Sequence, residues 1–221
     1  GSLLSEIVAQ TLPDVTLAIL SGPTFAIEVA KGLPTAVTLA SKNANALAAL
    51  SKAITTPTFR AYKSQDTIGV EICGAIKNVL AIGCGIIEGR KLGDNARAAF
   101  ITRGLAEIAR IAKAKGADTG TMLGLSGLGD LTLTCNAMQS RNFSLGVALG
   151  EGHALESILA KRFSVAEGVF TASSVVLLAK TLNIDTPLCA AMDSILNKKG
   201  DIDKTIQDLL ARPVGNEDPL G

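Results

Sequence analysis

The stretch that most constrains this chain is a nearly continuous apolar run from Val70 to Ile82. Apart from Glu71, Lys77 and Asn78, the run holds only apolar or small residues, and it contains no proline. This composition favours a helix that is buried on most of its sides, because an amphipathic surface helix would show a regular polar face. We therefore expect the rest of the chain to pack around this helix.

Lys77 is the charged residue near the middle of this run. Burying an ammonium group is costly unless it is paired, and desolvation lowers the pKa of a buried lysine in general. A lysine in such a place can exchange a proton near neutral pH and act as a general base. The alternative is a lysine whose stem lies along apolar surface while its charged end reaches water. The stretch by itself favours this alternative.

The amino-acid composition limits the kinds of molecule that this chain is expected to bind. The 221 residues are 48% hydrophobic, which is enough for a packed core, and the formal net charge is +1. Six phenylalanines, one tyrosine and no tryptophan leave few side chains on which bases could stack. The chain therefore gives no basis for a nucleic-acid partner or for binding to an anionic membrane surface. No uncharged apolar run is long enough to span a bilayer, so we expect no integral membrane association.

The cysteines and the single histidine limit the possible chemistry. The four cysteines contain no CxxC pair and stand among apolar or small residues, which favours buried free thiols in a reducing cytoplasm. His153 is the only histidine and lies in a polar turn. A histidine-based catalytic triad or a multi-histidine metal site is therefore not expected, and we expect no metal.

The first part of the chain, residues 1–64, alternates helical periodicity with short apolar runs that have the length of buried strands. Such alternation is typical of an α/β sheet domain. The expected helices cover residues 3–12, 25–31 and 43–54, and the expected strands cover residues 15–20, 35–40 and 59–62.

The second part, residues 65–221, shows helical periodicities and no convincing strand. The fold class that follows is mainly α, with an all-helical domain preceded by the last strands of an α/β domain. The expected helices cover residues 67–89 with a possible break near 83–85, residues 96–115, a segment from 142 to 148, and residues 156–161, 169–182, 187–197 and 202–210.

Two glycine-rich segments invite comparison with a dinucleotide-binding fingerprint. The glycines at 83, 85 and 89 give GxGxxxG, and residues 124–129 give GxxGxG. Neither segment follows an expected strand inside a βαβ unit, so neither fits the fingerprint. Close packing of two helices explains the first segment better, and a tight turn that presents Asp130 explains the second.

Polar residues interrupt apolar surroundings at three places: Lys77, Asp130 and the segment Ser140-Arg141-Asn142. An arginine with serine and asparagine at the start of a helix can form a phosphate or carboxylate clamp. The alternatives are an ordinary N-cap for Ser140, a surface arginine, and a capping role for Asp130.

The segment Ser21-Gly22-Pro23-Thr24 follows an expected strand and precedes an expected helix. Such a strand end is a usual place for ligand contacts in an α/β sheet. Gly22 allows a ligand to approach the backbone, and Thr24 can donate its hydroxyl. The alternative is a plain strand–helix turn with Thr24 as the N-cap.

Five segments together resemble bacterial NAD(P)-dependent glycerol-3-phosphate dehydrogenase. They occur in the same order as in that family, from about residue 3 to residue 212, and five segments in register are far more specific than one motif. They are Ser21 to Ala30 (SGPTFAIEVA), Gly69 to Val79 (GVEICGAIKNV), Asn95 to Glu107 (NARAAFITRGLAE), Gly124 to Leu131 (GLSGLGDL), and Ser140 to Asn142 (SRN).

The resemblance implies a fold and an activity. It implies that residues 1–64 are the remnant of a dinucleotide-binding Rossmann domain. It also implies that residues 65–221 form a helical substrate domain like the C-terminal domain of 6-phosphogluconate dehydrogenase. The family interconverts sn-glycerol 3-phosphate and dihydroxyacetone phosphate with NAD or NADP, which supplies phospholipid precursors. We expect a cytoplasmic protein that forms a homo-oligomer such as a dimer.

The resemblance also implies roles for individual positions. Lys77 matches the family lysine that takes the proton from the C2 hydroxyl during hydride transfer. The positions that match contacts to glycerol 3-phosphate are Gly22, Thr24, Lys77, Asp130, Ser140, Arg141 and Asn142. The positions that match contacts to the nicotinamide cofactor are Ala26, Arg141, Val165 and Glu167.

The chain departs from the family pattern because it lacks the GxGxxG-bearing half and the second lysine that the family places there. The main pyrophosphate site is then absent, and we expect this chain alone to be inactive or nearly so and to self-associate through an uncovered sheet edge. The alternative functions are the substrate domain of another hydroxy acid dehydrogenase of the 6-phosphogluconate dehydrogenase group, or a non-catalytic helical interaction module. The residues that would select NAD or NADP are not in this sequence.

Overall fold

The computed structural model describes residues 2–161 and 166–217, which group into two compact units. The sheet unit contains residues 2–74 and 112–133, and the helical unit contains residues 75–111 and the described residues from 134 onward. This grouping reflects packing and does not test the expected domain boundary between residues 64 and 65. The limits of the units after residues 74, 111 and 133 all fall inside helices.

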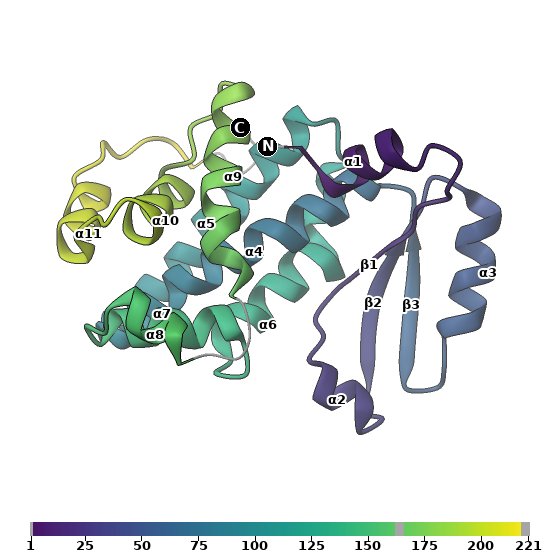
Figure 1. Ribbon diagram of the computed structural model, residues 1–221, viewed down its shortest axis with the longest axis horizontal. Coiled ribbons are helices and arrows are strands. Elements are labelled where there is room, and N and C mark those ends of the chain that lie inside the picture. The colour runs from purple at the N-terminus through teal and green to yellow at the C-terminus, as the bar shows by residue number, and fades with distance from the viewer. Residues whose placement is uncertain (1, 162–165, 218–221) are drawn as a thin grey trace. The chain divides into compact units, whose positions relative to one another are not determined.

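The sheet unit contains a three-stranded sheet in the order β1-β2-β3 (Figure 1). Strand β1 is antiparallel to β2, whereas β2 and β3 are parallel and are joined by helix α3, as a parallel pair requires a crossover. The strands are β1 (Ile19–Ser21), β2 (Thr35–Ala40) and β3 (Phe59–Ser64), and the helices among them are α1 (Leu4–Thr11), α2 (Ala26–Ala30) and α3 (Ala44–Ile54).

The expected strand over residues 15–20 is shorter in the structure, because only Ile19–Ser21 pair with β2. Residue 17 does not join the ladder; its carbonyl accepts a hydrogen bond of 2.7 Å from the Ser41 hydroxyl. Val15 is 56% exposed, so the first part of the apolar run is not the buried segment that its composition indicated. The other two expected strands and the three expected helices of this part are present.

The glycine-rich segment before Asp130 is a wide helical turn rather than a loop. Residues Leu125–Gly129 (η2) form a π-helical turn that follows a 3₁₀ turn at Thr119–Leu123 (η1) and leads directly into helix α6 (Asp130–Asn136). A Cβ atom on Gly127 would lie 2.2 Å from the carbonyl oxygen of Met122, so only glycine fits this approach. Glycine at this position therefore allows close backbone packing. Helix α6 was not predicted from the sequence.

The long apolar run forms helix α4 (Thr67–Gly89), which is continuous through residues 83–85. The expected break is wrong, because the glycines there are accommodated by close packing against another helix. By length and composition alone α4 is long and apolar enough to cross a membrane, although it carries Glu71, Lys77 and Glu88 and so is not an uncharged run. However, 72% of its most apolar window is buried inside the protein, as in a core helix.

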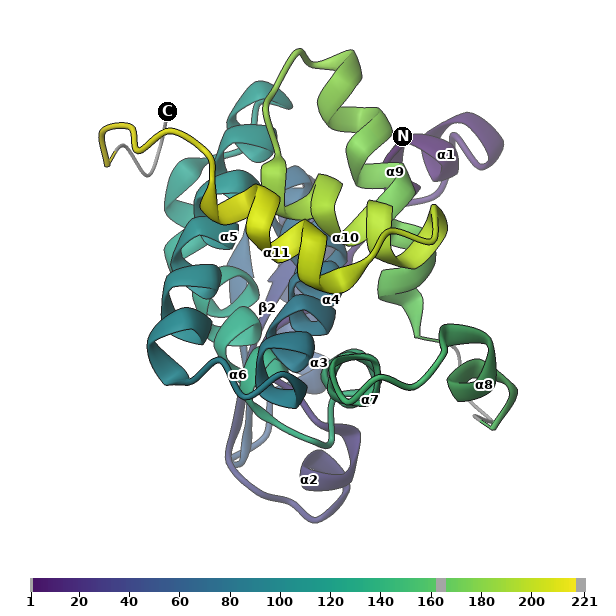
Figure 2. The same ribbon diagram turned by 90° about the vertical axis from the view of Figure 1, so that its left-hand side faces the viewer.

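The helical unit confirms the expected mainly α fold over the residues that the structure describes. Helices α9, α10 and α11 pack in succession (Figure 2). The core of this unit includes Val79, Ile82, Leu145, Ala172 and Met192. Besides part of α4, its helices are α5 (Asp94–Ala114), α7 (Arg141–Gly150), α8 (Leu155–Ala160), α9 (Glu167–Thr181), α10 (Pro187–Asn197) and α11 (Ile202–Leu210).

Candidate active site

Lys77 lies on a strip of α4 that neighbouring elements do not cover completely. Ala75, Lys77 and Asn78 keep part of their surface exposed, whereas Val79 and Leu80 are fully buried. Lys77 is therefore half-buried and not fully enclosed. Partial burial does not decide between the two interpretations of Lys77, so its role in proton transfer stays a prediction.

The segment Ser140-Arg141-Asn142 forms the start of α7. The Ser140 hydroxyl accepts a hydrogen bond of 3.2 Å from the backbone N–H of Phe143, which confirms that Ser140 is an N-cap. Ser140 and Asn142 are buried, whereas the Arg141 side chain is 52% exposed. Ser140 thus caps the helix start, and Arg141 is the first residue of α7, at the end where the helix dipole favours an anion.

The Asn142 side chain links three helices of the helical unit. Its Nδ2 donates a hydrogen bond of 3.0 Å to Oδ1 of Asn78 on α4. Its Oδ1 accepts a hydrogen bond of 3.1 Å from the backbone N–H of Gly168 at the start of α9. Helix α9 has no side-chain cap of its own at Ala166, so Asn142 supplies this cap from another helix.

Asn78 is a site residue that the sequence interpretation missed. It directly follows Lys77, and its carboxamide is the acceptor for Asn142. The carbonyl of Asn78 would lie 2.6 Å from a Cβ on Gly168, so α9 begins in close contact with α4. The sequence offered one signal, an asparagine in an otherwise apolar helix, which requires a hydrogen-bond partner when it is partly buried.

A glycine seam holds α7 close to α4. We use this term for Gly85 and Gly89 on α4 together with Gly146 and Gly150 on α7. A Cβ on Gly146 would lie 2.0 Å from the carbonyl oxygen of Ile82, and a Cβ on Gly85 would lie equally unfavourably close to α7 backbone. The seam confirms the expected helix–helix packing, and it sets the distance at which Asn142 can reach Asn78.

Arg141 and Glu167 form an ion pair between the starts of two helices. Nη2 of Arg141 lies 2.8 Å from Oε1 of Glu167, the first residue of α9. Both side chains remain about half exposed, with 52% and 46% of their surfaces accessible. The structure thus brings together Arg141 and Glu167, two of the positions expected to contact the cofactor. Val165, a third such position, lies outside the described residues.

The sheet unit holds the remaining predicted site residues. Gly22 has φ of +151°, and a Cβ there would lie 2.9 Å from the Cα of Val37, so this position requires glycine. Thr24 does not cap α2, because the N-cap is Phe25, which makes no capping hydrogen bond through its side chain. The capping interpretation of Thr24 is wrong, and its contact with a ligand stays a prediction. Ala26 is the first residue of α2.

Asp130 is the first residue of α6 and is only 2% exposed. The turn that precedes it lies against the segment from Gly22 to Thr24, since a Cβ on Gly129 would lie 3.6 Å from Pro23 Cδ. The structure therefore brings the backbone at Asp130 close to this segment within the sheet unit. At the first position of a helix, a carboxylate is favoured by the helix dipole.

Cys73 illustrates the electrostatic surroundings of this part of the sheet unit. Burial raises the pKa of its thiol to about 12, and the negative charges of Asp66 and Asp130 add to the effect. The thiol lies 3.4 Å from the sulfur of Met122. A neutral, enclosed thiol is not a nucleophile at neutral pH. All four cysteines are buried and free, as the sequence indicated.

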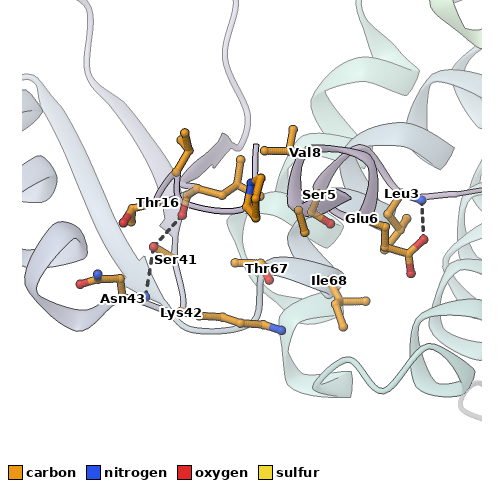
Figure 3. Close-up of a pocket in the computed structure, with 14 residues that line it drawn as sticks. Leu3, Ser5, Glu6, Val8, Thr16, Ser41, Lys42, Asn43, Thr67 and Ile68 are labelled. Carbon is orange, nitrogen blue, oxygen red and sulfur yellow. Dashed lines mark hydrogen bonds between the residues drawn. The ribbon is translucent and has the colours of Figure 1, made fainter. Parts of the chain in front are cut away.

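The sheet unit also contains a cavity of about 450 Å³ that none of the predicted site residues line (Figure 3). Its walls come from α1, residues 13–17, the segment 41–43 and the start of α4. Figure 3 shows the hydrogen bonds of Ser41 on one side and the bond from Leu3 to Glu6 on the other. Among the residues that the structure describes, no three His, Cys, Asp or Glu side chains gather as a metal site.

Comparison with known proteins identifies relatives over almost the whole chain. Residues 66–207 match the family described as NAD-dependent glycerol-3-phosphate dehydrogenase C-terminus, and residues 1–47 match the corresponding N-terminus family. A glycerol-3-phosphate dehydrogenase, NAD(P)+ type, from Rhodospirillum rubrum is 56% identical over 214 residues, which are 97% of this chain and 61% of the relative. The one from Parvibaculum lavamentivorans is 53% identical, over 97% of this chain and 65% of the relative. The chain thus spans less than two thirds of these relatives.

Solved structures show the same similarity. The crystal structure of glycerol-3-phosphate dehydrogenase from Coxiella burnetii superposes with a TM-score of 0.92 at 46% identity, over 95% of this chain and 65% of that one. The yeast enzyme from Saccharomyces cerevisiae superposes with a TM-score of 0.82 at 27% identity, over 95% of this chain and 63% of that one.

Both family matches are to parts of NAD-dependent dehydrogenases, so the chain falls in this class of protein. The chain belongs to the NAD-dependent glycerol-3-phosphate dehydrogenase family, because the C-terminal family match covers most of its length. The resemblance seen in five short segments is thereby confirmed. The roles of the individual residues stay predictions.

Proposed function

We propose that this chain provides the substrate-binding and proton-transfer part of an enzyme that interconverts sn-glycerol 3-phosphate and dihydroxyacetone phosphate with NAD or NADP. One observation carries the proposal. Asn142 joins the start of α7, which bears Arg141, to Asn78, the residue next to Lys77. A cation suited to a phosphate and a candidate base are therefore held on directly linked helices.

The reaction requires two groups from this chain. Oxidation of the alcohol removes a proton from the C2 hydroxyl and a hydride from C2; Lys77 takes the proton and returns it to the carbonyl oxygen in the reverse direction. Arg141 and the start of α7 bind the phosphate and orient C2 toward Lys77. The nicotinamide ring, when bound, supplies the site that accepts or donates the hydride.

Arg141 and Glu167 also fit contact with a dinucleotide. Both side chains are about half exposed, so a cation and a hydrogen-bond acceptor are accessible at one place in the helical unit. Such a pair suits a phosphate and a sugar hydroxyl. Ala26 on α2 and Val165 complete the proposed set of cofactor contacts. The proposal includes NAD and NADP equally.

A complementation assay tests this proposal. The chain is mixed with the separately expressed GxGxxG-bearing part of a relative, and loss of NADH is followed with dihydroxyacetone phosphate. We expect activity that falls by a factor of about 10² or more in Lys77→Ala, the range for losing a general base. Lys77→Arg keeps the charge without the proton exchange and should be similarly impaired.

Two results would separate the alternatives. Turnover of other phosphorylated hydroxy acids, but not of dihydroxyacetone phosphate, would indicate another dehydrogenase of the wider group. Full activity of Lys77→Ala in an associated mixture would indicate a non-catalytic helical module. Normal turnover by the chain alone would contradict the expectation that it is inactive by itself.

We also propose that the protein is a cytoplasmic homo-oligomer that serves phospholipid precursor synthesis. Four buried free thiols are typical of a reducing compartment. Leu20 on the edge strand β1 is 52% exposed and Phe170 on α9 is 69% exposed, which favours self-association. A single monomeric species in analytical ultracentrifugation at micromolar concentration would contradict the oligomer.

A further inference from the structure

The Arg141 guanidinium, which is proposed to bind the phosphate, already forms an ion pair with Glu167. The Nη2–Oε1 distance of 2.8 Å makes this a hydrogen-bonded pair. Each residue is the first of its helix, Arg141 in α7 and Glu167 in α9. The ends of these helices are held together independently by Asn142, which bonds to Asn78 and to Gly168. The two charged side chains are therefore kept within reach of each other by the backbone.

An incoming phosphate meets this pair as a second anion. A phosphate dianion at the guanidinium would stand next to the Glu167 carboxylate, and like charges at such a distance repel each other. The carboxylate must therefore leave the guanidinium, at least in part, when the phosphate binds. Because both side chains are about half exposed, the pair itself is worth little, and solvent readily replaces the lost contact.

The environment of Glu167 supports such an exchange. As the first residue of α9, its carboxylate is favoured at the positive end of a helix dipole whether or not it contacts Arg141. The carboxylate therefore keeps the favourable effect of the helix start after it leaves the guanidinium. Because the helix start still stabilises the carboxylate after the exchange, moving the carboxylate costs little free energy. The phosphate then contacts the Arg141 guanidinium in its place.

We infer that Glu167 is an internal competitor for Arg141: in the unliganded protein its carboxylate occupies the guanidinium, and a phosphate-bearing substrate displaces it. The inference rests on the proposed phosphate site at Arg141. It assigns Glu167 a function that sets the affinity of this site for the phosphate group. Removing the charge of Glu167 then strengthens phosphate binding at this site.

The test is binding of glycerol 3-phosphate and of inorganic phosphate to the whole 221-residue chain, followed by nitrogen-15 NMR of the arginine side chains and by calorimetry. Glu167→Gln keeps the size of the side chain and removes the charge. We expect it to bind both ligands about three- to tenfold more tightly than the unaltered chain, from the loss of an exposed ion pair and of the repulsion. The difference should shrink as salt is added.

A matched control removes the effect of net charge. Asp185 and Arg212 form another exposed ion pair of the helical unit, so Asp185→Asn changes the net charge equally and releases a different arginine. It should leave phosphate affinity unchanged. Arg141→Gln should abolish binding both alone and together with Glu167→Gln.

The possible failures are distinct. Equal or weaker binding by Glu167→Gln, with binding still lost in Arg141→Gln, would overturn the competition and leave the phosphate site standing. Equal strengthening by Asp185→Asn would reduce the effect to net charge and also overturn it. Absence of binding in every variant, or binding that survives Arg141→Gln, would overturn the phosphate site and with it the competition.

Discussion

At the scale of single residues, the helical unit uses buried side chains of one helix to cap the start of another. Asn142 does this for α9, and Glu107 on α5 does it for α10. Glu107 is 1% exposed, and its two oxygens accept the backbone N–H groups of Leu188 at 2.7 Å and Cys189 at 3.1 Å. Thr186, the N-cap of α10, makes no capping bond through its side chain. The cap therefore depends on a residue about eighty positions away.

The first prediction concerns Glu107→Gln. The substitution replaces one acceptor oxygen with an N–H₂ group that faces a backbone N–H, so a buried donor loses its partner. We expect a loss of about 1–3 kcal/mol in the free energy of unfolding, measured by urea denaturation. Glu156→Gln, which alters an exposed glutamate of α8, should cost less than about 0.5 kcal/mol. Equal effects in both variants would show that the cap contributes nothing.

The second prediction concerns the pH dependence of stability at Asp193. Burial alone would raise the pKa of this carboxyl, but hydrogen bonds from Lys198, Ser173 and Asn197 together lower it below its ordinary value of 3.8. A folded-state pKa below the unfolded value adds stability above the unfolded pKa, and this stability is lost as the pH falls through the folded pKa. Asp193 joins α9 to α10, so its protonation loosens this helix pair.

Asp193→Asn should therefore remove much of the acid sensitivity of the helical unit. We expect the variant to be less stable at pH 7, by about 1–3 kcal/mol, because a buried group loses charge-assisted hydrogen bonds. The gap to the unaltered protein should narrow as the pH falls below 3.8. Thermal unfolding between pH 2 and pH 7 measures this, and a constant gap over that range would contradict the linkage.

At the scale of elements, the glycine seam decides how α7 approaches α4. Ala has a better helix propensity than Gly by about 1 kcal/mol, so Gly146→Ala would be stabilising on an isolated helix. In the seam the added methyl would meet the carbonyl of Ile82 at 2.0 Å and the Cα of Gly85 at 2.9 Å, and backbone cannot move aside easily. The clash should outweigh the propensity.

The third prediction is therefore that Gly146→Ala costs about 1–3 kcal/mol in urea denaturation. It should also weaken the bond from Asn142 to Asn78, seen as faster exchange of the Asn142 side-chain amide. Gly104→Ala is the comparison, because its methyl would meet the side chain of buried Leu80 rather than backbone and should therefore cost less. A control that costs as much as the seam variant would refute the argument.

The elements also show what the sequence could and could not predict. Periodicity located the long helices of the second part, because apolar spacing reports burial directly, but it missed α6. It misplaced the start of β1, because the carbonyl of residue 17 bonds to Ser41 instead of joining the ladder, and composition does not show that choice. It missed Asn78 and the cap of α9, since Asn142 lies 64 residues from the one and 26 from the other.

At the scale of the whole molecule, the limits of the two units fall inside helices. The boundary between them crosses α4 after Gly74, α5 after Ile111 and α6 after Leu133. A helix is a cooperative structure, since each added residue depends on the turn before it. Disturbing α4 in one unit should therefore disturb the part of α4 that belongs to the other.

The last prediction follows from this sharing. Ile82 is fully buried in the helical unit, and Ile82→Ala should cost about 2–5 kcal/mol of stability. Because Ile82 lies on the shared helix, hydrogen exchange should accelerate both in α9 of the helical unit and in β2 of the sheet unit. Val175→Ala on α9, a helix confined to one unit, should accelerate exchange mainly within the helical unit. If hydrogen exchange in β2 were no faster in Ile82→Ala than in the unaltered protein, each unit would unfold by itself. Helix α4 would then not couple the unfolding of one unit to that of the other.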